Sequence, residues 1–177
     1  MELFRAIILV LALILLASFF VAAEIALISL REGQVKQMKG KRGARVAKLT
    51  ANPNRFLAAA QVGVTVCGFL SAALGAEKLG VFVEPHLIDL GLSLGSARVI
   101  SIIAVTLVIA YFSLVFGELV PKRLALYRSE SISLYSSFII DGIARLFRPI
   151  IWLLSKSTDL VMSLFGVNPK SERAQIS

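Results

Sequence analysis

The chain has 177 residues, of which 57% are hydrophobic and 17% are charged, and its mean hydropathy is +0.82. Soluble domains are about 45–50% apolar and about 25% charged, and disordered chains are poorer still in apolar residues, so both classes are excluded. A net charge of +8 is also found in nucleic-acid-binding proteins, but here the charges lie beside apolar segments, which argues against a nucleic-acid partner and for a lipid bilayer.

The first predicted element is a membrane-spanning helix over residues 6–30. This run of 25 residues carries one charge, Glu24. A helix of that length measures roughly 37 Å, which is enough to cross a hydrocarbon core of about 30 Å. A cleaved signal peptide is the alternative, but its apolar region would be only about 7–15 residues long. We therefore expect a permanent span.

Two further spans are predicted, over residues 56–76 and about 99–120, with a loop over 77–98 between them. The second span is uncharged and rich in Gly, Ala and Ser, which allow close approach of helices in a membrane. The third is uncharged before Glu118. Residues 1–127 are thus expected to form a three-helix transmembrane domain.

Basic residues are concentrated in one connecting segment. Segment 31–55 has eight Lys and Arg residues and one acid, whereas segment 77–98 has two basic and three acidic residues. Basic segments remain in the cytoplasm. We therefore expect the N-terminus outside and the C-terminus inside an inner or plasma membrane.

Residues 128–167 are expected to form amphipathic juxtamembrane helices. Five charges fall on one helical stripe: Asp141, Arg145, Arg148, Lys156 and Asp159. A helix of this kind lies in the membrane interface, and Pro149 is expected to kink or divide it. A fourth crossing is the alternative, but it would bury several charges. The polar residues 168–177 are expected to start a linker.

Two acids lie within the predicted spans, and an ionisable group at membrane depth is a candidate functional residue. Glu118 follows Gly117 and precedes Pro121, which lacks an amide hydrogen and is expected to break the helix and free a carbonyl around Gly117. A carboxylate beside a freed carbonyl is how transporters bind hard cations such as Mg²⁺ or Na⁺. Each acid is equally compatible with a structural role: Glu24 could cap the helix cluster at the cytoplasmic interface or pair with Lys122, and Glu118 could be merely interfacial.

The other polar candidates lie in the second and third spans. Gln61 and Thr65 share a helix face because they are four residues apart, and Ser113 shares a face with Gly117. Cys67 and Ser71 are further polar candidates in the second span. Hydroxyl and amide groups also hold membrane helices together, and that alternative stays open.

Three motifs resemble those of the cyclin M/CorC family of membrane proteins, in the family's order. Residues 19–29 (FFVAAEIALIS) resemble its first-helix motif, residues 61–65 (QVGVT) its second and residues 117–125 (GELVPKRLA) its third. The resemblance implies a homodimer in which each chain has three membrane helices. It also implies a short cytoplasmic helix pair within 33–55 and a juxtamembrane helix belt over 130–165.

The resemblance also implies a function. By this resemblance the chain is expected to share the family's association with Mg²⁺ efflux coupled to Na⁺ entry, and a cytosolic pair of CBS domains that bind ATP with Mg²⁺ normally follows in family members. The present chain resembles the family's membrane module, truncated before those domains.

The family's ligand pattern is retained only in part. Gly117 and Glu118 are present. The positions that resemble the family's serines before the first-helix acid hold Val21 and Ala23, and those that resemble its asparagine hold Val64 and Cys67. Mg²⁺ needs about six oxygens, so water would have to replace the missing ligands.

We therefore expect the transport domain of a CorC-like divalent cation transporter. Its ligands would be Glu118, Gly117, Ser113, Thr65, Gln61 and Glu24, with Pro121 and Lys122 as gating residues. The alternative is a non-transporting membrane anchor that links nucleotide-sensing CBS domains to a partner membrane protein. An enzyme is not expected, because the single histidine, His86, has no nucleophile and acid arranged around it in the sequence.

Overall fold

The computed structural model describes residues 1–165, and within that range the chain is helical, with no strand. Its elements are α1 (Glu2–Ser29), α2 (Glu32–Gln37), α3 (Gly40–Thr50), α4 (Pro53–Asp89), α5 (Leu94–Phe112), the π-helix η1 (Ser113–Leu119), α6 (Val120–Tyr127), α7 (Ser129–Leu146) and α8 (Arg148–Leu164). Three helical rods in the described part are long and apolar enough to cross a membrane: α1, α4, and α5–η1–α6. This confirms the predicted all-α fold with three spans.

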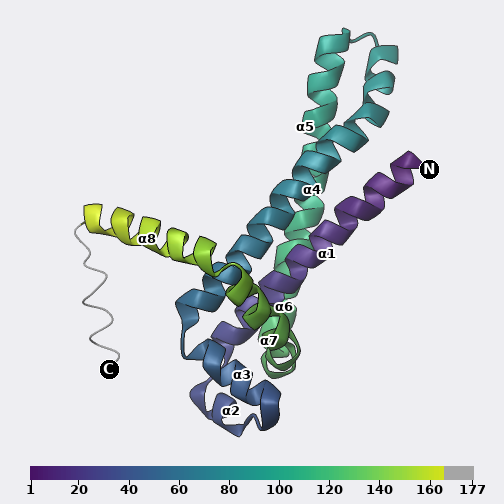
Figure 1. Ribbon diagram of the computed structural model, residues 1–177. Helices are drawn as coiled ribbons and strands as arrows, with labels where there is room; N and C mark the ends of the chain where they lie inside the picture. The colour runs from purple at the N-terminus through teal and green to yellow at the C-terminus, as the bar shows by residue number, and fades with distance from the viewer. Residues whose placement is uncertain (166–177) are drawn as a thin grey trace.

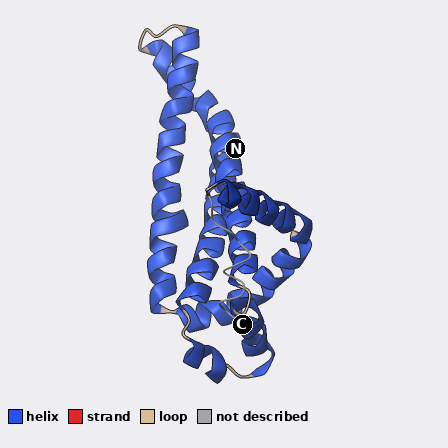
Figure 2. Ribbon diagram, turned by 90° about the vertical axis from the view of Figure 1, so that its left-hand side faces the viewer, coloured by secondary structure: helices blue, strands red, loops and turns tan. Residues whose placement is uncertain are grey.

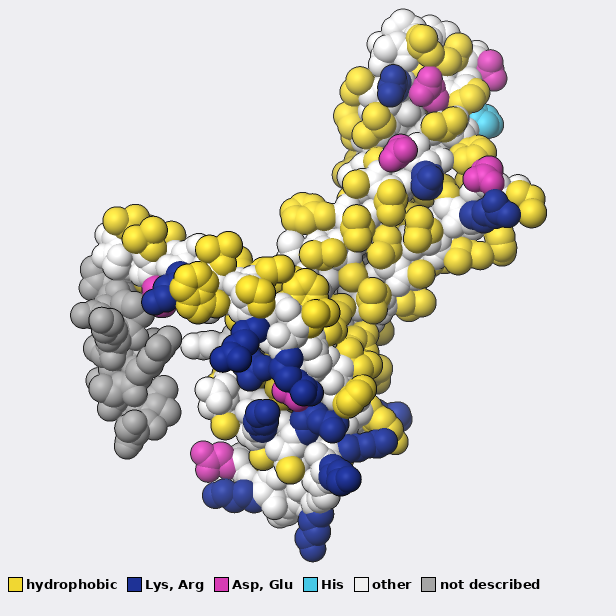
Figure 3. Space-filling view, viewed as in Figure 1, with side chains coloured by type: hydrophobic (Ala, Val, Ile, Leu, Met, Phe, Trp, Pro, Cys, Tyr) yellow, Lys and Arg dark blue, Asp and Glu magenta, His cyan; other side chains and the backbone are white. Residues whose placement is uncertain are grey.

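The rods form a bundle with a small lobe at one end. Figure 1 shows α1, α4 and α5 running side by side, with α2 and α3 below them and α8 projecting to the side. Figure 3 shows hydrophobic side chains over the middle of the bundle and most Lys and Arg side chains over the lower lobe. The apolar middle matches the expectation of a multi-pass membrane protein.

The second span is longer than predicted, and the loop expected over residues 77–98 is wrong. α4 has 37 residues and continues to Asp89. Only residues 90–93 connect it to α5, with Gly91 at a left-handed φ of 91°. Leu79 and Val83 keep the helix packed against buried residues of α1 and α5, while the charged side chains Glu77 and Lys78 stay exposed. The α4–α5 hairpin therefore extends past the N-terminal end of α1 (Figure 2).

Small residues on α4 bring the three spans close together. A methyl group on Gly63 would lie 2.6 Å from the Phe20 ring of α1, and one on Gly75 would overlap Ile109 of α5. Packing of this kind is what associates helices in a membrane. The small residues of the second span therefore have the packing role that the sequence indicated.

The predicted short helix pair is present as α2 and α3. The side-chain oxygen of Gln34 accepts the amide of Arg31 at 2.9 Å, and its side-chain nitrogen donates to Glu130 at 2.7 Å, which ties α2 to α7. Arg42 lies over the Tyr135 ring at 5.2 Å, and this cation–π contact joins α3 to α7. The helix pair is thus packed onto the bundle.

We expect Gly43→Ala to destabilise this lobe. A methyl group on Gly43 would overlap the backbone carbonyl of Met38, which cannot move without shifting the turn between α2 and α3. Overpacking costs about 1–3 kcal/mol, measurable as a lower midpoint of thermal unfolding. Gly33→Ala is the matched control, because nothing lies within 4 Å of a methyl group there. Equal midpoints for the two variants would contradict the packing described here.

The juxtamembrane region is divided into α7 and α8 near Pro149, as the sequence predicted. α7 ends at Leu146, and Pro149 lies in the first turn of α8, where its missing amide is tolerated. The expectation of a single exposed charged stripe is wrong at Asp141. This side chain is 95% buried, because α7 packs against α1, α3 and α4, and its carboxylate accepts from Arg145 at 2.8 Å. The predicted linker 168–177 and the last two residues of segment 128–167 lie outside the described range.

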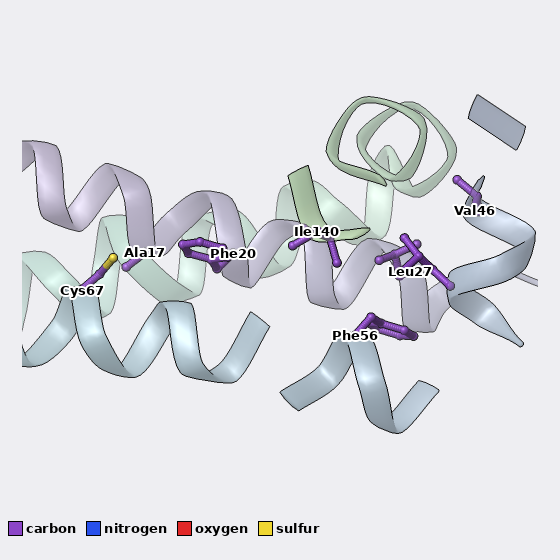
Figure 4. Close-up of a cluster of buried hydrophobic side chains, with 9 residues drawn as sticks. Ala17, Phe20, Leu27, Val46, Phe56, Cys67 and Ile140 are labelled. Carbon is purple, nitrogen blue, oxygen red and sulfur yellow. The ribbon is translucent and has the colours of Figure 1, made fainter. Parts of the chain in front are cut away.

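One apolar cluster holds the lower half of the bundle together. It joins α1, α3, α4 and α7 through nine buried side chains, among them Phe20, Leu27, Val46, Phe56 and Ile140. Figure 4 shows Phe56 and Leu27 facing each other, with Cys67 and Ala17 side by side at the other end of the cluster. That end leads to the candidate site.

Candidate functional site

A small cavity lies between the three spans near the middle of the bundle. Its volume is about 50 Å³, and its walls come from α1, α4 and η1: Leu13, Ile14, Ala17, Val64, Cys67, Gly68, Ser71, Ser113, Gly117 and Glu118. Gly117 faces Ile14, which is close to the midpoint of α1. Cation sites of transporters also lie near the bilayer midplane.

Three side chains bring oxygen atoms to this cavity: Glu118, Ser113 and Ser71. The Ser71 hydroxyl is buried and has no hydrogen-bond partner among the described residues. A buried hydroxyl without a partner is costly, so it favours a ligand or water in the cavity. Ser71 was not among the predicted ligands, although its spacing of four and seven residues from Cys67 and Val64 places all three on one face of α4.

The sequence predicted that Pro121 breaks the helix, and this prediction is wrong. The π-helix η1 precedes Pro121, and the chain stays helical into α6. The Val120 amide donates to the Val115 carbonyl, five residues back. In that register the next amide would belong to Pro121, which has none and therefore cannot donate to the Phe116 carbonyl. A π-helical turn of this kind is frequent at functional sites.

An ion pair adjoins the cavity. The Lys122 ammonium lies 3.0 Å from the Glu118 carboxylate, and both side chains are less than half exposed. The lysine therefore pairs with one of the two acids that the sequence singled out in the spans.

Three of the six predicted ligands lie outside the cavity. Gln61 and Thr65 are exposed on another face of α4, where the Gln61 amide donates to the Thr65 hydroxyl at 3.5 Å. Glu24 is ten residues beyond Ile14 on α1, which is roughly 15 Å along the helix axis. The structure brings together only Ser113, Gly117 and Glu118 from the predicted set.

Of the four positions where this chain departs from the family's ligand pattern, two line the cavity and two do not. Val64 and Cys67 line the cavity beside Glu118, whereas Val21 and Ala23 are buried elsewhere in α1. The cavity is therefore mostly apolar, with one carboxylate and two hydroxyl groups among its ten lining residues. Within the described residues, no three His, Cys, Asp or Glu side chains gather as a metal cage.

Comparison with known proteins identifies similar chains. Residues 7–177 match the family described as the Cyclin M transmembrane N-terminal domain. The UPF0053 protein sll0260 of Synechocystis is 38% identical over 161 residues, which cover 89% of this chain and 36% of that protein. The UPF0053 protein YrkA of Bacillus subtilis is 32% identical over 163 residues, which cover 90% of this chain and 38% of that protein.

A third relative has a name that describes an activity. The Polyamine export protein of Haemophilus influenzae is 29% identical over 180 residues, which cover 100% of this chain and 41% of that protein. The present chain thus spans only about two-fifths of the length of the relatives it matches.

Proposed function

Because the chain belongs to the family of the cyclin M transmembrane N-terminal domain, we propose that it is the transport unit of an exporter that moves Mg²⁺ out of the cell in exchange for Na⁺. The family is related to membrane transport and is not a known enzyme family. The identity of the transported ion and its coupling to Na⁺ are proposed in addition to the family membership.

The cavity at Glu118 is the observation that carries the proposal. It places a carboxylate and two hydroxyl groups between three membrane helices at mid-bundle depth. Hard divalent cations are bound by oxygen ligands of this kind. Mg²⁺ gives up its water reluctantly, so a small site with few protein oxygens favours a partly hydrated ion as the transported substrate.

Lys122 supplies a way to couple binding to a change of state. When no ion is bound, the lysine neutralises Glu118 at 3.0 Å. An arriving cation competes for the same carboxylate and displaces the ammonium. The two arrangements of Lys122 differ in their affinity for the ion, and transport requires such a difference.

We also propose that the chain forms a homodimer through one face of α4. Gln61 and Thr65 are exposed polar residues within an apolar span, and polar groups at that depth are costly against lipid. A second copy packed on this face of α4 would cover them, as expected for a homodimer.

We further propose that the basic α2–α3 segment is cytoplasmic and that the N-terminus is outside a cell membrane. CBS domains would follow in the whole protein.

A polyamine is the second candidate substrate, favoured by the name of the Haemophilus influenzae relative. Its ammonium groups could also pair with Glu118. The cavity volume of about 50 Å³ fits a small ion with water better than an extended organic chain. The apolar Val64 and Cys67 walls are the feature that favours the amine.

Calorimetric titration of the purified chain tests the proposal, with Mg²⁺ in the presence and absence of Na⁺ and, separately, with spermidine. We expect saturable Mg²⁺ binding that weakens as Na⁺ is added. Spermidine binding without Mg²⁺ binding would move the assignment to polyamine export. A folded chain that binds neither would contradict the transport proposal and favour the membrane anchor.

We expect Cys67→Asn to bind Mg²⁺ about five-fold more tightly. The substitution adds an amide oxygen to the cavity wall, and a net polar contact is worth about 1 kcal/mol. The measurement is the same calorimetric titration. Ala73→Asn is the control, because that side chain is exposed on α4 and does not line the cavity. If Ala73→Asn tightened binding as much as Cys67→Asn, the oxygen would not be acting in the cavity.

A further inference from the structure

A second and larger hollow lies at the opposite end of the apolar cluster from the small cavity. Its volume is about 660 Å³, within the range of about 300–1,000 Å³ typical of small-molecule sites. The walls come from the last turn of α1, from α2 and α3, and from the first turns of α4. Most lining residues are apolar: Leu27, Ile28, Leu30, Val35, Ala47, Ala51, Pro53, Phe56 and Leu57.

This hollow lies at one end of the membrane-spanning helices. α1 leaves the apolar span at Ser29, and α4 enters its own span from Pro53, so the hollow lies where the chain passes from hydrocarbon to water. Ile28 on its wall is 54% exposed. An exposed apolar patch at this level is typical of a contact with a membrane, a ligand or another protein.

The rim of the hollow is charged, with Glu32 and Lys36 as its two charged lining residues. Their side chains are 3.8 Å apart and almost fully exposed, so this pair is weak and leaves the lysine available. The surrounding segment 31–55 has eight basic residues against one acid. Figure 3 shows how densely Lys and Arg side chains cover this lobe.

We propose that this hollow binds one anionic phospholipid. An acyl chain fills the apolar walls between α1, α3 and α4, and the phosphate of the headgroup pairs with Lys36 and neighbouring basic side chains. Anionic lipids of the cytoplasmic leaflet are attracted to basic juxtamembrane segments in this way. The bound lipid would link the lobe of α2 and α3 to the ends of two spans. The inference does not depend on which ion the small cavity binds.

Native mass spectrometry of the chain in detergent tests the site. Phosphatidylglycerol and phosphatidylcholine with the same acyl chains are the probes. Ala47→Trp fills the hollow from α3, and Ala44→Trp is the matched control, because that alanine is exposed on the same helix but does not line the hollow. Lys36→Gln tests the headgroup contact, with the exposed Lys78 of α4 changed to Gln as its control.

We expect the unchanged chain and the two control variants, Ala44→Trp and Lys78→Gln, to retain bound phosphatidylglycerol. Ala47→Trp should bind at least ten-fold less of it, and Lys36→Gln should lose the preference over phosphatidylcholine. Equal binding of both lipids by the unchanged chain would overturn the proposal, as would normal binding by a folded Ala47→Trp chain. A change in the number of associated chains caused by Ala47→Trp, with lipid binding intact, would assign the hollow to a second copy instead.

Discussion

Replacement of Glu118 by glutamine is expected to weaken Mg²⁺ binding by about 100-fold, or about 2.7 kcal/mol. Among residues 1–165, Glu118 provides the only carboxylate on the walls of the small cavity. The other oxygen-bearing side chains there are the hydroxyl groups of Ser71 and Ser113, which carry no charge to balance a divalent ion. Transport into liposomes that contain a Mg²⁺-sensitive dye should fall in parallel with the calorimetric affinity.

The glutamine variant should fold normally, because its side chain has nearly the same shape and can still accept a hydrogen bond from Lys122. Glu77→Gln is the control, since this acid is exposed on the extension of α4 and lies outside the cavity. It should bind Mg²⁺ like the unchanged chain. Wild-type transport by Glu118→Gln would rule out the cavity as the ion site, even if the family function were correct.

Phe56→Ala is expected to have the largest effect on stability. The Phe56 ring is 1% exposed and packs in the cluster that joins α1, α3, α4 and α7 (Figure 4). Truncation of a buried phenylalanine costs about 3–5 kcal/mol, because the apolar contacts are lost and a cavity remains. The midpoint of thermal unfolding in detergent should therefore fall sharply.

Phe4→Ala is the control for this substitution. Phe4 lies near the N-terminus of α1 and is 68% exposed, and it is not on the α4 face that is proposed to contact a second copy. Its truncation should shift the midpoint by only a small fraction of the Phe56→Ala shift. If Phe4→Ala were the more damaging variant, the cluster would not be the main support of the lobe.

The small cavity lies in the middle of the bundle and the large hollow at one end of it. Phe56 lines the large hollow, while Cys67, from the same cluster, lines the small cavity. If the two proposed sites are coupled, the Mg²⁺ affinity of the chain should differ with and without phosphatidylglycerol.

The sequence by itself determined the fold class and the number of spans. Hydrophobicity over about 20 residues is a local property, so α1 and residues 56–76 of α4 could be recognised without knowing their neighbours. The division of α7 from α8 at Pro149 is also local, because a missing amide acts on its own helix. The motifs around Glu24, Gln61 and Glu118 indicated the family, which residues 7–177 match.

Only the tertiary structure decided which residues face one another. α4 is apolar or small on most of its faces, so its sequence could not show that Ser71 faces the cavity while Gln61 and Thr65 face outward. The extension of α4 to Asp89 depends on contacts of Leu79 and Val83 with α1 and α5, and the burial of Asp141 depends on the packing of α7. In each case the deciding energy comes from contacts between segments far apart in the chain, which local pattern does not contain.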